Sequence, residues 1–338
     1  MNYSIHTFEL RRYISKKEYM CYRDYFFTDC EGRYKVYDKD KSVIVCRFAD
    51  KGIRIKLSRT KHRQYIDVII NPLEVLYSGN LIDLIPSKTE LRDSMLAADK
   101  MLTKYLGEEF GIDNLELIRI DFCVNVTVEN KEQVKAYIKL AHKTGSKKGY
   151  RVVGRKNKCI NKESGFKAEN KQAGTALSIY SKQDQLIDIN KSADDAERIL
   201  RIEFQLTKKS RVDRYTDGIT ANTRKIIYCF ENSRECIYSI LKKTIPHGRY
   251  YKLDTAMSIV NECIKNKTKR NNMIELLKLV SKKHSIKCGI DALVENDYAV
   301  SRHYARELLK AFEKIDVNVV TIGKRYPMNC LPGIYSYL

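Results

Sequence analysis

Residues 117–128, LIRIDFCVNVTV, show the period of a β-strand that buries one of its two faces. Apolar and polar side chains alternate along the stretch, and the apolar set is Ile118, Ile120, Phe122, Val124, Val126 and Val128. Arg119 and Asp121 therefore lie on the opposite face, together with Asn125 and Thr127. We expect a strand with Asp121 in its middle, directed away from the core.

Three further stretches show a polar row of the same kind. In residues 199–207, ILRIEFQLT, Glu203 lies two positions after Arg201, just as Asp121 follows Arg119. Acids are poor strand formers, so acids in the middle of two strands require a physical reason. The other members of the polar row come from two more stretches, residues 64–71, QYIDVIIN, and residues 175–182, TALSIYSK. We expect that row to bring together Asp67, Asp121, Tyr180, Lys182 and Glu203.

The rest of the chain predicts an α+β protein with a mostly antiparallel sheet and flanking helices. Residues 42–48 and 53–57 form a hairpin around Gly52, and a helix begins after Ser87, which has Glu90 three residues later as a capping box. Residues 131–142 have helical periodicity, as do 221–243 and 254–316. We therefore predict a sheet-based domain over residues 1–215 and a smaller, mainly helical domain over 216–338. Residues 291–318 resemble a turn and the second helix of a helix-turn-helix, which would recognise origin DNA, but helical bundles unrelated to DNA share this pattern and a protein-docking domain is the alternative.

The charge balance indicates a polyanionic partner. The chain has 338 residues with 63 Lys and Arg against 42 Asp and Glu, a net charge of +21, and its 43% hydrophobic content excludes a disordered chain. Such a field attracts nucleic acid, because each neutralised phosphate releases a counterion. The alternative is a basic protein with no nucleic-acid role.

Other patterns exclude several classes of protein. The ten cysteines form no C-x-x-C, so neither a zinc ribbon nor a disulfide framework is indicated, and no P-loop motif predicts an ATPase. The histidines are scattered, with no H-x-H pair. The start of the chain lacks a signal-peptide core and no apolar run of about 18 residues occurs, so we expect a cytoplasmic protein with reduced thiols and no membrane partner.

A basic loop over residues 143–171 precedes the Tyr180 strand. It contains four glycines and many lysines and arginines, with Glu163 and Glu169 as its acids. A solvated insertion is one interpretation. The other is a segment that orders on DNA through phosphate contacts from Lys147, Lys148, Arg151 and Arg155.

The polar row of the sheet has two interpretations. In the first, Arg119–Asp121 and Arg201–Glu203 are solvated ion pairs, each contributing about 0–1 kcal/mol. In the second, the acids hold Mg²⁺ or Mn²⁺, since hard cations take carboxylate, phosphate and water oxygens. Tyr180 is then a candidate nucleophile that needs positive charge nearby, from Lys182 or the metal, because a phenol ordinarily has a pKa of about 10. By spacing alone, packing is the commoner role for a tyrosine.

Four motifs in order resemble those of the filamentous-phage gene II replication initiators and their plasmid relatives, which are rolling-circle nicking enzymes. They are YIDVIINPLEVLYSGN, IRIDFCVNV, SIYSKQDQL and LRIEFQLTK, starting at residues 65, 118, 178 and 200. The resemblance covers residues 65 to about 210 and extends only loosely into the C-terminal part. The chain lacks the histidine–hydrophobe–histidine strand of many rolling-circle nucleases, so it would have a divergent form of that fold with an acid-only metal site.

The resemblance implies a metal-dependent enzyme that nicks and rejoins DNA at a specific site. Tyr180 would form a 5′-phosphotyrosine, with Lys182 assisting, and the free 3′-hydroxyl would prime rolling-circle replication or transfer of a mobile element. Asp121 and Glu203, together with Asp67, would hold Mg²⁺ or Mn²⁺, while Arg119 and Arg201 would contact phosphate. Expected partners are origin DNA, single-stranded or supercoiled, a host helicase and a polymerase, and a homodimer is left open.

Two other classes of function compete with this interpretation. One is a non-catalytic DNA-binding replication or regulatory protein that kept the sheet but not the activity. The other is an RNA-binding module, which would need aromatic side chains for base stacking on the sheet face. Only Tyr65 and Tyr180 offer such rings, so this class ranks last.

Overall fold

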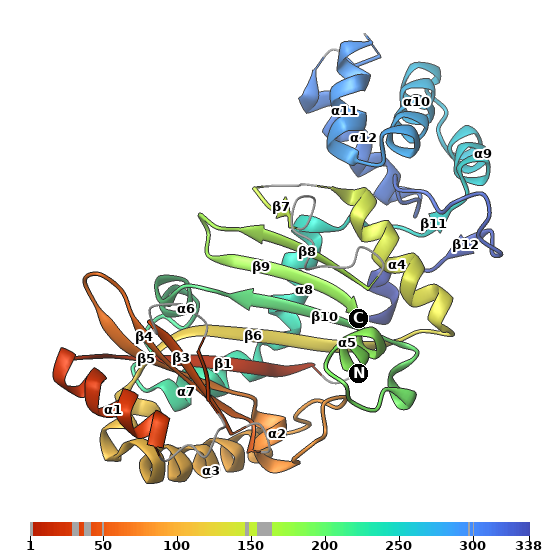
Figure 1. Ribbon diagram of the computed structural model, residues 1–338. Helices are drawn as coiled ribbons and strands as arrows, with labels where there is room; N and C mark the ends of the chain where they lie inside the picture. The colour runs from red at the N-terminus through yellow and green to blue at the C-terminus, as the bar shows by residue number, and fades with distance from the viewer. Residues whose placement is uncertain are drawn as a thin grey trace.

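One large antiparallel sheet organises the protein (Figure 1). The structure is a computed structural model that describes residues 3–28, 34–36, 42–48, 51–145, 149–153, 164–296, 298–299 and 301–338. In this part of the chain ten strands pair in the order β2-β3-β4-β5-β1-β6-β10-β9-β8-β7. Their bounds are β1 Tyr3–Ile14, β2 Tyr34–Val36, β3 Val43–Phe48, β4 Ile53–Arg59, β5 Gln64–Ile70, β6 Glu116–Thr127, β7 Arg151–Val152, β8 Gly165–Asn170, β9 Thr175–Ser181 and β10 Ile199–Leu206.

Helices follow the strands and dominate the C-terminal part. They are α1 Lys16–Thr28, α2 Pro72–Leu76, α3 Lys88–Leu106, α4 Lys131–Thr144, α5 Lys182–Asp188, α6 Lys209–Tyr215, α7 Asn222–Glu231, α8 Ser233–Thr244, α9 Leu253–Cys263, α10 Lys267–Lys283, α11 Ile286–Glu295 and α12 Arg302–Lys314. The short strands β11 Tyr250–Tyr251 and β12 Cys330–Leu331 form a second, two-stranded sheet. The predicted fold class, an antiparallel sheet with flanking helices and a helical C-terminal region, is confirmed.

The apolar rows of the central strands form the core on one face of the sheet. Phe122 of β6 stacks with Phe204 of β10 at 6.0 Å between ring centroids, and Tyr215 of α6 meets Phe122 edge-on at 5.7 Å. Helices α7 and α8 pack against β1 and β6, and α4 packs against β8 and β9. Because the strands are pleated, the residues between these apolar positions are left for the other face.

Helices α9 to α12 lie beyond the β7 end of the sheet, and the two chain ends lie close together (Figure 1). The Tyr3 hydroxyl donates to the carbonyl oxygen of Leu338 at 2.7 Å. Helices α7 and α8 come after residue 215 in the chain, yet they pack against strands β1 and β6 of the sheet. The division into two domains at residue 215 stays a prediction. No helix among the described residues has the length and apolarity needed to cross a bilayer.

Candidate active site on the polar face of the sheet

Strand register places the predicted site residues on the face opposite the core. Arg201 of β10 pairs with Tyr180 of β9, and Glu203 pairs with Cys123 of β6. One step further, Gln205 pairs with Asp121. Residues that pair directly across an antiparallel ladder point to the same face. Tyr180, Glu203 and Asp121 therefore share the polar face, as the alternation in the sequence predicts.

Tyr180 and Glu203 form the centre of this face. The Tyr180 hydroxyl donates to Oε1 of Glu203 at 2.5 Å, and the Glu203 side chain is 8% exposed. Burial, and next the charge of Glu203, raises the pKa of the Tyr180 phenol well above its ordinary value. On β8, the residue opposite Tyr180 is Gly165, so no side chain stands beside the half-buried tyrosine on that strand.

His6 is a third member of the centre that the sequence interpretation missed. Its Nδ1 lies 3.2 Å from Oε1 of Glu203. The register between β1 and β6 shifts between Ile5 and Thr7, which is a β-bulge that leaves His6 outside the ladder. Burial, with Arg201 and Lys182 nearby, lowers the pKa of His6 to about 3, so its ring is neutral at pH 7.

Lys182 is close to the centre, but on a different element from the one predicted. Strand β9 ends at Ser181, which caps α5, and Lys182 is the first residue of that helix. The expectation that Lys182 continues the strand is therefore wrong, because the Ser181 cap turns the chain into a helix. The lysine is 2% exposed and its Nζ donates to Oε1 of Gln185 at 2.7 Å. Burial, and next the charge of Arg201, lowers its pKa to about 7.

Arg201 is fully buried, which differs from its predicted role as a surface phosphate contact. Its Nε donates to Oδ1 of Asn125 at 2.8 Å, and Nη2 donates to the carbonyl oxygen of Ile82. Nη1 has no hydrogen-bond partner among the described residues, and Arg201 forms no ion pair with Glu203 there. Leu81 and Ile82 pack against Leu186 in a small apolar cluster over this end of the polar face. Arg201 therefore acts on Tyr180 through its charge.

Asp121 is held by four hydrogen bonds. Arg119 donates to its two oxygens at 2.8 and 2.6 Å, while Thr7 and Gln205 donate to Oδ2 at 2.8 and 3.1 Å. Arg119 and Asp121 therefore form an ion pair, but it is not the solvated pair of the first interpretation, because Asp121 is buried. Asp121 is 2% exposed, so its charge is neutralised inside the sheet face.

Asp67 lies far from the other acids. Arg11 donates to its two oxygens at 2.6 and 3.0 Å, and Lys56 Nζ lies 3.6 Å from Oδ2. Arg11 pairs with Asp67 on one side and with Glu116 on the other, five positions from Asp121. The Cα atoms of Asp67 and Asp121 are therefore roughly 19 Å apart, a distance made up of two interstrand spacings and five residues of rise along the strand. The prediction that Asp67 joins the other acids is wrong, because strand β1 intervenes and the register displaces it.

The described residues do not fit the predicted acid-only metal centre. No three His, Cys, Asp or Glu side chains in the described part of the chain are arranged to hold a cation. Asp67 is remote, and the oxygens of Asp121 already accept hydrogen bonds from Arg119, Thr7 and Gln205. Glu203 is the one predicted ligand that faces Tyr180.

The predicted DNA-contacting residues of the basic loop are only partly described. Lys147, Lys148 and Arg155 lie outside the described residues. Arg151 begins β7 and is exposed at the edge of the sheet, opposite Glu169 of β8. Its DNA contact stays a prediction.

Comparisons with known proteins return little. No protein-family model matches the sequence, and no curated protein matches it. A rolling circle replication initiator protein from Geobacillus stearothermophilus is similar at 9% identity and a TM-score of 0.31, over 72% of this chain and 85% of that one. DynU16, a protein of the dynemicin biosynthetic locus, is similar at 10% identity and a TM-score of 0.20, over 66% of this chain and 98% of that one. At these scores neither likeness bears on function, which must be argued from this chain's own residues.

Proposed function

We propose that the protein cuts one strand of DNA by transferring it to Tyr180 and can later rejoin it. The observation that carries this proposal is the 2.5 Å hydrogen bond from the Tyr180 hydroxyl to Glu203, with the buried cations Arg201 of β10 and Lys182 of α5 close by. A phenol beside a carboxylate is a nucleophile beside its base, and the charge of the buried cations favours the negative charge that develops at phosphorus. The net charge of +21 supplies the long-range attraction to DNA.

The cleavage step follows from this geometry. Glu203 accepts the phenolic proton while the Tyr180 oxygen forms a bond to phosphorus, and the bond between phosphorus and the 3′-oxygen breaks. Since burial holds the pKa of Tyr180 high, the free phenolate is rare and the base is needed at the moment of attack. The product is a 5′-phosphotyrosine and a free 3′-end.

In this proposal Lys182 gives a proton to the leaving 3′-oxygen. With a pKa of about 7, it exists in both protonation states near neutral pH, as an acid in one direction and a base in the reverse direction must. Its hydrogen bond to Gln185 orients the amine. In rejoining, Lys182 takes the proton from the 3′-hydroxyl and protonated Glu203 returns one to the tyrosine.

His6 acts as a positioning residue. Its ring lies against the same Glu203 oxygen that accepts from Tyr180, with Nδ1 3.2 Å away, and this contact restricts the orientation of the carboxylate. Because the described residues assemble no acid-only metal centre, no step is assigned to a cation here. A requirement for Mg²⁺ or Mn²⁺ stays a prediction from the sequence resemblance.

We place this chemistry in rolling-circle replication or transfer of a mobile element. A free 3′-hydroxyl can prime a polymerase, and the phosphotyrosine bond keeps the energy needed to circularise the displaced strand. The sequence has no P-loop motif, so strand separation would fall to a separate helicase.

The test is a covalent-adduct assay with single-stranded and supercoiled DNA that carries the element's own origin. Wild-type protein should form nicks and an adduct that survives denaturant, and Tyr180→Phe should form no adduct while binding DNA nearly as well. Tyr65→Phe is the matched control, because Tyr65 lies on the polar face of β5 and should leave the adduct unchanged. DNA binding by the wild type with no adduct on any origin DNA would support the non-catalytic alternative instead.

A further inference from the structure

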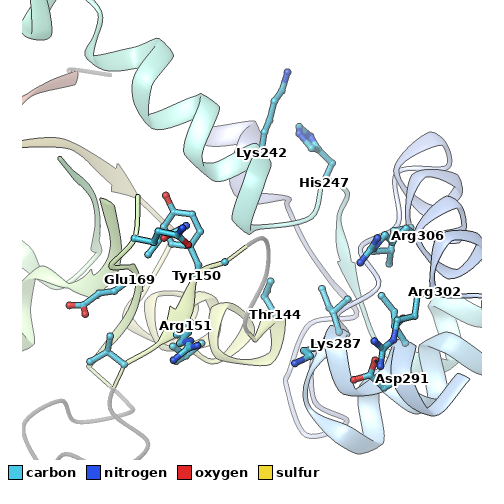
Figure 2. A pocket seen from close by; sticks show the side chains of 18 of the residues that line it. Thr144, Tyr150, Arg151, Glu169, Lys242, His247, Lys287, Asp291, Arg302 and Arg306 are labelled. Carbon is cyan, nitrogen blue, oxygen red and sulfur yellow. Dashed lines mark ion pairs between the residues drawn. The ribbon is translucent and has the colours of Figure 1, made fainter. Parts of the chain in front are cut away.

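A large basic groove lies at the end of the sheet, away from Tyr180. It has a volume of about 2010 Å³ and runs between the edge strands β7 and β8 on one side and helices α11 and α12 on the other (Figure 2). Of the described residues that line it, seven are Lys or Arg and three are acidic. The strand wall and the helix wall thus both present positive charge to the groove, so a bound polyanion would contact cations on two sides.

The helical wall carries a regular row of cations. Arg302, Arg306 and Lys310 recur every four residues on α12, so they form one stripe along the helix, while Ala305, Leu308 and Phe312 are buried on its other side. Helices α10, α11 and α12 pack on one another, so the stripe is displayed by a supported helix. Residues 291–318, which resemble the second half of a helix-turn-helix in the sequence, begin inside a helix, since Asp291 lies in α11.

The ion pairs in the groove leave several cations for a ligand. Arg302 lies 3.0 Å from Asp291, and Lys310 lies 2.8 Å from Glu307. Within the described part of the chain, Arg151, Lys171, Lys242, Lys287 and Arg306 have no carboxylate within ion-pair distance. All five are exposed.

The rings in the groove favour phosphate contacts over the stacking of unpaired bases. Tyr150 is 7% exposed and its hydroxyl bonds to Thr175 at 2.6 Å, and His247 stacks on Tyr335 at a centroid distance of 3.7 Å. Tyr238 is exposed, but Nζ of Lys242 lies over its ring, 4.7 Å from the centroid. Single-strand binders instead offer free aromatic faces to successive bases. A duplex presents two phosphate backbones and a major groove wide enough for a helix such as α12.

The groove is within reach of the candidate active site. Arg151 pairs with Glu169, which lies four residues along β8 from Gly165, the partner of Tyr180. Four residues of rise and two strand spacings place the Cα atoms of Arg151 and Tyr180 roughly 16 Å apart on the same face of the sheet. This corresponds to about five base steps of B-form DNA.

We propose that this groove binds double-stranded DNA next to the strand that Tyr180 cuts, with α12 in the major groove and Arg151 and Lys171 on the backbone. The proposal rests on the DNA-cleaving function proposed above. In this arrangement the duplex binds in the groove beside β7, and the strand to be cut reaches Tyr180 on β9 across β8.

The experiment measures binding of the full chain to a labelled duplex two helical turns long, and to one of its single strands, by fluorescence anisotropy over a range of salt concentrations. In the variant Arg302→Gln, Arg306→Gln, Lys310→Gln, the slope of log affinity against log salt for the duplex should become shallower by about 2.7, and the affinity should fall about 100-fold near 0.15 M salt. Arg151→Gln with Lys171→Gln should reduce the slope by about 1.8. The single strand should lose much less in both variants.

The matched control is Lys267→Gln, Lys282→Gln, Lys283→Gln, which removes three exposed charges from α10 outside the groove. It should change the duplex slope by less than half as much as the α12 variant. Any of three results would overturn the proposal: the control and the α12 variant lose the same duplex affinity, the α12 variant loses as much affinity for the single strand as for the duplex, or its duplex affinity does not change. Duplex binding through the groove by a protein that forms no adduct would refute the proposed cleavage alone, whereas adduct formation without groove dependence would refute the groove alone.

Discussion

Glu203→Gln should slow formation of the protein–DNA adduct by about 10²–10⁴-fold, the range expected when a general base is lost. The amide keeps the size of the side chain and its oxygen can still accept the hydrogen bond that Tyr180 now makes at 2.5 Å. It cannot take the phenolic proton. The loss should therefore be in the rate of the step and not in the affinity for DNA.

A second effect of this substitution has the opposite sign and is smaller. Removing the negative charge of Glu203 lowers the pKa of Tyr180, which favours the phenolate. Burial is the larger cause of the raised pKa and remains in the variant, so the phenol stays protonated at neutral pH. The variant should consequently gain rate as the pH rises, because hydroxide must replace the missing base.

The assay is single-turnover adduct formation on a labelled oligonucleotide, followed on denaturing gels at several pH values. Glu116→Gln is the control, because Glu116 is a carboxylate of β6 that pairs with Lys209 at 2.9 Å and makes no contact with Tyr180. It should stay within about twofold of wild type, and thermal unfolding should show that both variants fold. A Glu203→Gln rate within about threefold of wild type at saturating DNA would refute the general-base role.

Two further predictions concern charge in the site. Burial disfavours protonated Lys182 in the folded protein, so between pH 7 and 9 the unfolded chain binds more protons at this residue than the folded protein does. In urea titrations over this range, the free energy of unfolding of wild type should rise with pH by on the order of 1–3 kcal/mol more than that of Lys182→Met. Equal rises in both proteins would contradict this. Arg119→Gln removes the cation that pairs with Asp121 but should leave the DNA-free protein, like wild type, without tight Mn²⁺ binding in calorimetry, because the described residues assemble no group of three metal ligands. Tight Mn²⁺ binding by either DNA-free protein would contradict this.

The alternation of apolar and polar residues was sufficient to predict the polar face. Residues 117–128 and 199–207 became β6 and β10, and Asp121 and Glu203 lie on neighbouring strands as that period implies. A side-chain period of two follows directly from the pleat, so it can be seen in a single sequence. The capped helix after Ser87 followed from local chemistry in the same way.

Strand β1 could not be found by period, although it lies between β5 and β6 in the sheet. Its register against β6 shifts between Ile5 and Thr7, where His6 is the extra residue, and this bulge exchanges the two faces of the residues that follow on β1. The alternation in YSIHTFELRRYI is therefore broken, and His6 gave no signal as a site residue. The displacement of Asp67 had a related cause, because strand order and register are long-range properties that no local pattern contains.

The measurement closest to the central claim identifies the residue that becomes attached to DNA. After adduct formation on origin DNA, digestion with nuclease and trypsin should yield the peptide from Gln172 to Lys182, in which Tyr180 is the one tyrosine, carrying a nucleotide through a 5′-phosphate. Fragment masses should place the modification on Tyr180 and leave the neighbouring serines unmodified. A nucleotide attached to another residue, or through its 3′-phosphate, would contradict the account.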